Sequence, residues 1–105
     1  SMDTLSDKAK IVYAVFQSLE ARNLGSAITS YTVLNYIEEN EDLQEHELLK
    51  DIPEEEFVNI IMDMNIKSIN TLIASMCRKD LIEKTAPSSM KVDGERKNLR
   101  LYYLK

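Results

Sequence analysis

Apolar side chains recur three and four positions apart in several stretches of the chain, which is the spacing of one face of an α-helix. The first stretch predicts a helix that begins at Ser6, a favourable capping residue, and runs to about Asn23, before a stop at Gly25. A second helix is expected from near Ser30. The stretch 43–50 lacks a clean period and is expected to form a helical extension or an ordered connector.

A third helix is expected to end at Asn65. Asp51 is a candidate capping carboxylate, Pro53 suits the first turn, and the acids at positions 54–56 follow where the helix dipole favours negative charge. Three consecutive carboxylates point in different directions around a helix, so the dipole explains them better than a magnesium site does. The apolar stripe of this helix is formed by Phe57, Ile60, Ile61 and Met64.

The segment 66–79 predicts a fourth helix with an unusual polar face. Its core positions are Ile69, Leu72, Ile73 and Met76. The opposite face carries Lys67, Thr71, Ala74 and Arg78, flanked by Asn70 and Ser75. Short polar side chains between two cations, with no acid among them, are typical of contact with base edges and phosphates. An ordinary solvated face remains the alternative interpretation.

After Asp80 the pattern changes from helical to alternating, which predicts β-structure. Residues 81–85 indicate one strand, and residues 99–104 indicate the returning strand. Residues 87–89 and the pair Asp93-Gly94 have turn chemistry. The segment 81–104 is therefore expected to form a hairpin with a long loop.

The chain has 105 residues, of which 44% are hydrophobic and 30% are charged. This composition predicts one soluble globular domain, because a chain of this length can bury a core without disulfides. Ser1 and Met2 resemble the remainder of a cleaved expression tag, so the expected domain covers residues 3–105.

Charge is distributed unevenly along the chain. The net charge is −5, which by itself argues against nucleic acid as a partner. Residues 1–65, however, hold four basic and fourteen acidic side chains, whereas residues 66–105 hold nine basic and four acidic ones. This asymmetry is expected if one end of a small domain meets a polyanion.

The sequence offers little material for catalysis. Cys77 is the single cysteine, and His46 is the single histidine and stands between two glutamates, so neither a zinc site nor a nucleophile–base pair is expected. Two glycines cannot form a phosphate-binding loop. We therefore expect no enzyme, no cofactor and no metal. No apolar run is long enough for a membrane span, so a cytoplasmic location is expected, with the nucleoid as the site of a regulator.

Helices joined by a tight turn and followed by a basic hairpin resemble a winged helix-turn-helix domain. Residues 69–83 are similar to the recognition helix and following strand of MarR-like regulators, with Met76 at a leucine position and Asp80 at the usual glycine. Residues 93–96 are similar to the Asp-x-Arg wing motif of that family, with one residue more. The resemblance implies a mainly α (α+β) fold with three to four helices and a hairpin wing.

The resemblance also implies sequence-specific binding of double-stranded DNA by a transcriptional regulator. The helix 66–79 would enter the major groove, and the hairpin 81–104 would touch the backbone or minor groove. The residues expected to contact DNA are Lys67, Ser68, Asn70, Thr71, Ser75, Arg78, Lys91, Arg96, Lys97 and Arg100. MarR-like proteins dimerise through helices at both termini. Because this sequence ends at the second wing strand, we expect either a homodimer through the N-terminal helices, with Tyr13 and Tyr36 as candidates, or no dimer.

A second hypothesis is a protein-interaction module, such as a phage-type or plasmid-type adaptor or inhibitor, that uses the acidic half of the chain. The fourteen acids before Ile66 motivate this alternative, since they would also repel DNA.

Overall fold

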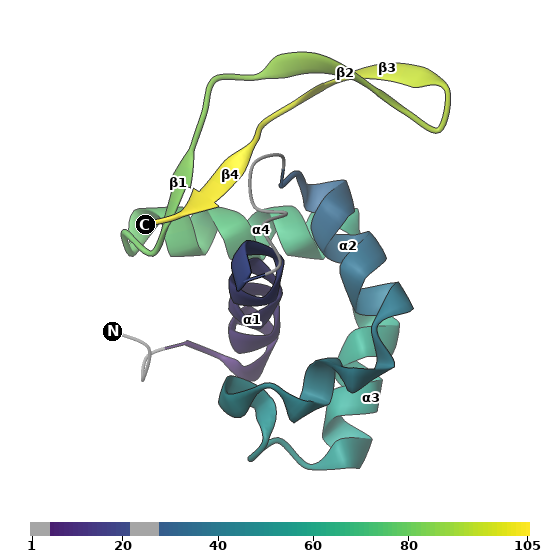
Figure 1. The fold of residues 1–105 in the computed structure, drawn as a ribbon, viewed down its shortest axis with the longest axis vertical. Helices are drawn as coiled ribbons and strands as arrows, with labels where there is room; N and C mark the ends of the chain where they lie inside the picture. The colour runs from purple at the N-terminus through teal and green to yellow at the C-terminus, as the bar shows by residue number, and fades with distance from the viewer. Residues whose placement is uncertain (1–4, 22–27) are drawn as a thin grey trace.

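The computed structural model describes residues 5–21 and 28–105. Within these ranges the α-helices are α1 (Asp7–Ala21), α2 (Ser30–Glu39), α3 (Glu54–Asp63) and α4 (Ile66–Arg78) (Figure 1). The strands that follow are β1 (Ile82–Lys84), β2 (Ser88–Val92), β3 (Glu95–Leu99) and β4 (Tyr102–Leu104). The predicted fold class is confirmed, since four helices followed by an antiparallel hairpin region form a mixed α+β fold in the layout of a winged helix.

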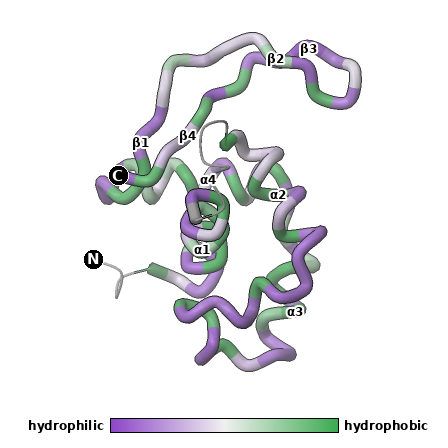
Figure 2. Tube along the Cα trace, in the orientation of Figure 1, coloured by the Kyte–Doolittle hydropathy of each residue, from purple (hydrophilic) through white to green (hydrophobic). Residues whose placement is uncertain are grey.

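The hydrophobic core lies where α1, α2 and α4 pack against one another. α1 contributes side chains with no exposed surface at Ile11, Val12, Val15 and Phe16. α4 contributes Ile69, Ile73 and Met76, which are equally buried. Hydrophobic and hydrophilic positions alternate along these helices in Figure 2, as expected for helices that bury one face. The helical periodicity thus predicted the buried face of α4 at Ile69, Ile73 and Met76, while the predicted core position Leu72 is partly buried.

The start of α1 agrees with the prediction, because Ser6 Oγ accepts a hydrogen bond from the Ala9 N–H at 3.2 Å. The predicted end at Asn23 and the stop at Gly25 lie outside the described residues. α2 begins at Ser30, as expected, behind a reciprocal capping interaction between Thr29 and Thr32.

The connector between α2 and α3 consists of two short 3₁₀ helices, η3 (Glu41–Glu45) and η4 (Glu47–Leu49). Leu43 and Leu49 anchor them in the core. His46 Nδ1 accepts a hydrogen bond from the Leu48 N–H at 3.1 Å, and the side chain is half-buried. His46 therefore has a structural role, because its ring caps η4.

The predicted cap of α3 is also wrong. Pro53 occupies the capping position, and no side chain caps the helix there. Asp51 lies two residues earlier, too far from the first turn to take that place. Of the predicted stripe of α3, Phe57 is buried, while Ile60, Ile61 and Met64 are partly buried.

The outer part of the hairpin, β2 with β3, is called the wing below. Ser88 pairs with Leu99 at one end of this ladder, and Val92 pairs with Glu95 at the other. The turn at Asp93 and Gly94 has φ values of 52° and 83°, which suits a two-residue hairpin turn with both positions left-handed.

Two strand predictions need correction. Ser88 and Ser89 do not form a turn, because they pair with Leu99 and Asn98 in the ladder. The returning strand begins at Glu95, earlier than expected, and it is interrupted before β4. The hairpin therefore has a tight turn rather than a long loop.

The hairpin bends between its two ladders, at Thr85. The Thr85 N–H donates to the Leu101 carbonyl at 3.0 Å, and the Leu101 N–H donates to Thr85 Oγ1 at 3.2 Å. Arg100 Nη1 donates to the Thr85 carbonyl at 2.9 Å. These bonds connect the wing to its base, where β1 pairs with β4 and the Tyr102 N–H donates to the Ile28 carbonyl at 2.8 Å.

Asp80 fixes the path from α4 into the hairpin. It has a φ of 64°, the left-handed conformation that ends many helices. The Leu81 N–H donates to the Met76 carbonyl at 3.0 Å, and the Asp80 N–H donates to the Cys77 carbonyl at 3.1 Å. This pair of bonds is a Schellman motif, which explains why glycine would also suit position 80.

Candidate nucleic-acid interface

The face of α4 that points away from the core carries exposed side chains along its whole length. Its exposed residues are Lys67, Asn70, Thr71, Ala74 and Arg78. Asn65 caps the helix, since Asn65 Oδ1 accepts from the Ser68 N–H at 2.9 Å. The predicted polar face of α4 is therefore a surface, and no acidic residue lies on this helix.

Two of the polar residues predicted to contact DNA have structural partners. Ser68 Oγ accepts from the Asn65 N–H and donates to the Asn65 carbonyl, each at 2.9 Å, so this hydroxyl belongs to the helix cap. Asn70 Oδ1 accepts a hydrogen bond from the Ser30 hydroxyl, which ties α4 to the start of α2. Asn70 remains exposed, whereas Ser68 is half-buried and its hydroxyl is engaged in the cap.

Two other predicted base-reading residues differ in accessibility. Thr71 is exposed, and its hydroxyl donates to the Lys67 carbonyl at 3.1 Å. Its oxygen can still accept a hydrogen bond from a ligand. Ser75 is only half-buried, at the edge of the exposed face of α4.

The wing presents one exposed face and one packed face. Alternation along the ladder places Ser89, Lys91, Arg96 and Asn98 on the exposed face. Lys91 stands directly opposite Arg96 in the register, and Arg96 Nη1 donates to Ser89 Oγ at 3.3 Å. Two cations opposite each other destabilise an antiparallel pair unless negative charge reaches them. Neither forms an ion pair with the residues that the structure describes.

Lys97 lies on the packed face of the wing, together with Met90, Val92 and Leu99, all half-buried. Its ammonium donates to the Tyr31 hydroxyl at 3.0 Å and lies 5.1 Å from the centre of the Tyr31 ring. The hydrogen bond with Tyr31 raises the pKa of Lys97 above its ordinary value. The predicted DNA contact at Lys97 is thus occupied by a contact between the wing and α2.

A basic cleft of about 300 Å³ separates α4 from the base of the hairpin. It is lined by Ala74, Cys77, Arg78, Lys84, Arg100 and Tyr102. Burial raises the pKa of the Cys77 thiol, and the nearby cations Lys84, Arg100 and Arg78 act in the opposite direction. Three cations and no carboxylate line this cleft, so it is suited to an anion such as a phosphate group.

Two residues of this cleft, Lys84 and Tyr102, were not predicted from the sequence. Lys84 follows the core residue Ile82 by two positions, so both lie on the same face of β1, and Lys84 lines the cleft together with Arg100. Tyr102 is half-buried, and burial raises the pKa of its hydroxyl. Arg100, which was predicted to contact DNA, also lines the cleft. Its Nη1 donates a hydrogen bond to the Thr85 carbonyl.

A wider cleft of about 650 Å³ lies between α2 and the tip of the wing. Tyr31, Asn35 and Glu39 line one side, and Lys91 and Asp93 line the other. Because both signs of charge occur in it, this cleft is less suited to a polyanion than the basic cleft.

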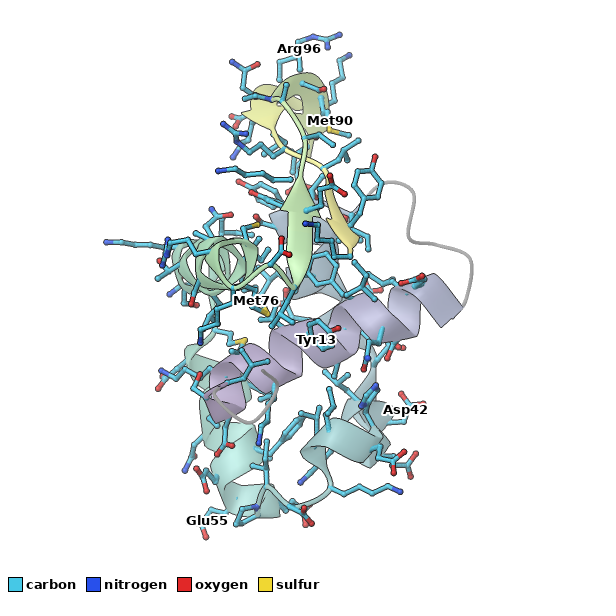
Figure 3. The ribbon with its side chains drawn as sticks, turned by 90° about the vertical axis from the view of Figure 1, so that its left-hand side faces the viewer. Tyr13, Asp42, Glu55, Met76, Met90 and Arg96 are labelled. Carbon is cyan, nitrogen blue, oxygen red and sulfur yellow. The ribbon has the colours of Figure 1, made fainter. Side chains whose placement is uncertain are left out.

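Acids predominate at one end of the molecule: residues 38–63 hold eleven acids and one cation, whereas the wing holds three cations and two acids. Arg96 marks one end of the long axis in Figure 3, and Glu55 marks the other. The molecule measures 38 Å along this axis. The charge asymmetry of the sequence is thus also an asymmetry in space, and the cations of the wing lie far from most of the acids.

The candidate dimer contacts differ in exposure. Tyr36 is buried in the core, with 8% of its surface exposed, so the prediction that it lies on a dimer surface is wrong. Tyr13 is partly buried and packs against the core.

Within residues 5–21 and 28–105, no cluster of three or more histidine, cysteine or acidic side chains could hold a metal ion. The same residues contain no helix with the length and apolar character of a membrane span.

Comparisons with protein-family models, with curated proteins and with solved structures find no match to this chain.

Proposed function

We propose that this protein binds double-stranded DNA in a sequence-specific manner and acts as a transcriptional regulator. In this proposal α4 enters the major groove, and the exposed face of the wing contacts the backbone or the minor groove. Lys67 and Arg78 hold phosphates or guanines, while Asn70 and Thr71 read base edges.

The observation that carries the proposal is the cross-strand pair of Lys91 and Arg96. These side chains are exposed and face each other in the ladder, and no acid of the described chain pairs with either. Such an arrangement costs stability in isolation, and it is relieved when phosphates approach the wing.

The basic cleft supports the same proposal from the side of α4. Arg78 belongs to α4, whereas Lys84 and Arg100 belong to the hairpin, and all three line one cleft. A phosphate bound there would contact cations of both α4 and the hairpin. This would fix the orientation of α4 relative to the groove, which is the role of phosphate contacts in sequence readers.

The proposal is tested with the whole chain and a fluorescent pool of random duplexes. Fluorescence anisotropy in about 50 mM salt should show binding that weakens steeply as salt is added, because counterions are released from DNA. Selection of bound duplexes followed by sequencing should then enrich one motif. Failure to bind any duplex in this low salt would contradict DNA binding, and binding without an enriched motif would contradict sequence-specific regulation.

A further inference from the structure

The helix α3 leaves much of its apolar face uncovered. Phe57 is its buried residue, whereas Val58 is 46% exposed and Met62 is 78% exposed. These two are the large hydrophobic side chains that stand out as exposed in the described part of the chain. They lie four positions apart, so they share one side of the helix. Exposed apolar side chains grouped in this way often mark a binding surface.

Val58 and Met62 line a groove of about 230 Å³. The rest of its apolar lining is formed by Ile37 at the end of α2, Leu43 of η3, and Phe57 and Ile61 of α3. The groove therefore runs between a helix, a 3₁₀ turn and a second helix. It contains no sheet edge, so an extended peptide could not add a strand there. A helix with one apolar face matches such a groove, because that face would cover the exposed apolar side chains of α3.

The rim of the groove is strongly acidic. Glu38 and Glu41 line it directly. Residues 28–65 as a whole hold eleven acids and one cation, Lys50, and hydrophilic residues predominate between α2 and the start of α3 in Figure 2. This charge repels nucleic acid and favours a positively charged occupant. A second copy using the same groove would bring acids against acids, which disfavours a symmetric dimer here.

We propose that this groove, called the α3 groove, binds a basic amphipathic helix of a partner protein. Apolar residues of that helix, spaced three or four positions apart, would pack on Val58, Ile61 and Met62. Its lysines or arginines would meet Glu38 and Glu41 at the rim. The groove and the wing occupy different ends of the molecule, so DNA and this helix can be bound together (Figure 3). The inference is independent of whether DNA is bound.

The test uses a fluorescent peptide of leucine and lysine, with the leucines on one helical face, and the whole protein. A scrambled peptide of the same composition, with leucines spread around the helix, is the control ligand. Anisotropy should show that the amphipathic peptide binds at least about tenfold more tightly than the scrambled one. Equal binding of the two peptides would show attraction by charge alone and would overturn the proposal.

Protein variants then locate the site. The double substitution Val58→Thr with Met62→Gln, at exposed positions, should lower the affinity for the amphipathic peptide by at least about tenfold. The double substitution Glu38→Gln with Glu41→Gln should lower the affinity for the amphipathic peptide by about fivefold and reduce the salt dependence of binding.

The matched control removes two acids outside the groove, Glu20→Gln with Glu83→Gln, and should change affinity by less than about twofold. Undiminished binding by the Val58 and Met62 variant would overturn the proposal. Sedimentation gives a further check: a dimer that dissociates in that variant would assign the groove to a second copy and would also overturn it. Duplex binding should be unchanged by the Val58 and Met62 substitutions, so a failure here is distinct from a failure of the DNA proposal.

Discussion

The two ends of this molecule differ in the sign of their charge and in the kind of surface that carries it. At the basic end, the wing carries its cations on a paired two-stranded ladder, and α4 carries its cations opposite its buried face. At the acidic end, residues 38–63 carry most of the acids on short helical pieces around an apolar groove. The basic end presents charge without apolar surface, and the acidic end presents both.

This difference shows that the charges are separated rather than paired. Although 30% of the residues are charged, the ion pair found in the described part of the chain is that between Lys105 and Asp80. Most charged side chains of the described residues are therefore left to solvent rather than paired within the molecule. A net charge of −5 describes neither end.

The largest expected effect comes from comparing one residue type at the two ends. Met76 of α4 has no exposed surface, whereas Met62 of α3 is 78% exposed. Met76→Ala should lower the free energy of unfolding by about 2–5 kcal/mol, because it leaves a cavity in the core. Met62→Ala should change it by about 0.5 kcal/mol or less. Urea unfolding followed by circular dichroism measures both values, and similar losses for the two variants would contradict the description of α3 as weakly buried.

The second effect concerns the wing. Lys91→Ala with Arg96→Ala should weaken duplex binding by about tenfold or more and flatten the plot of log affinity against log salt by about two units, one for each phosphate that the wing no longer neutralises. The measurement is anisotropy across a salt series.

The matched control is Lys8→Ala with Lys50→Ala, which removes two cations away from the wing. It should leave the salt slope nearly unchanged. If both double variants flatten the slope equally, binding depends on net charge and not on the wing.

The smallest expected effect concerns the contact between Lys97 of the wing and Tyr31 of α2. Tyr31→Phe removes the hydroxyl that accepts from Lys97, so the pKa of Lys97 should fall toward its ordinary value. A pKa raised by folding stabilises the charged form, and the gain is present below 10.5 and is lost as pH rises through the folded-state pKa. Amide exchange in β2 and β3 should become faster in the variant. An unchanged Lys97 titration by NMR would show that Tyr31 does not hold the wing.

The helices were predictable because their burial follows a regular period. Ile69, Ile73 and Met76 repeat at the spacing of one helical face, and all three are buried. The turn at Asp93 and Gly94 was predictable for a local reason, since few residues adopt a left-handed conformation at two successive positions.

Other features depend on contacts between distant residues. Lys97 and Tyr31 are sixty-six positions apart, so no local pattern could show that this cation is bound to α2. The serines of β2 suggested a turn, but pairing with β3 overrode that preference. The pattern in α3 identified its apolar stripe, but not which of its apolar side chains the rest of the chain would leave uncovered. By contrast, the Asn65-x-x-Ser68 spacing is a recognisable capping box and could have predicted the role of Ser68 in the helix cap.

The alternation of the wing limits how its length can vary. Each strand sends successive side chains to opposite sides, so one inserted residue before Asp93 would exchange the two sides of β2. Lys91 would then leave the face that it shares with Arg96, and Met90 would turn to solvent. Two inserted residues would restore the original sides and lengthen the ribbon. Whether the number of inserted residues is even or odd, more than the length of the strand, determines whether Lys91 and Arg96 remain on one cationic surface.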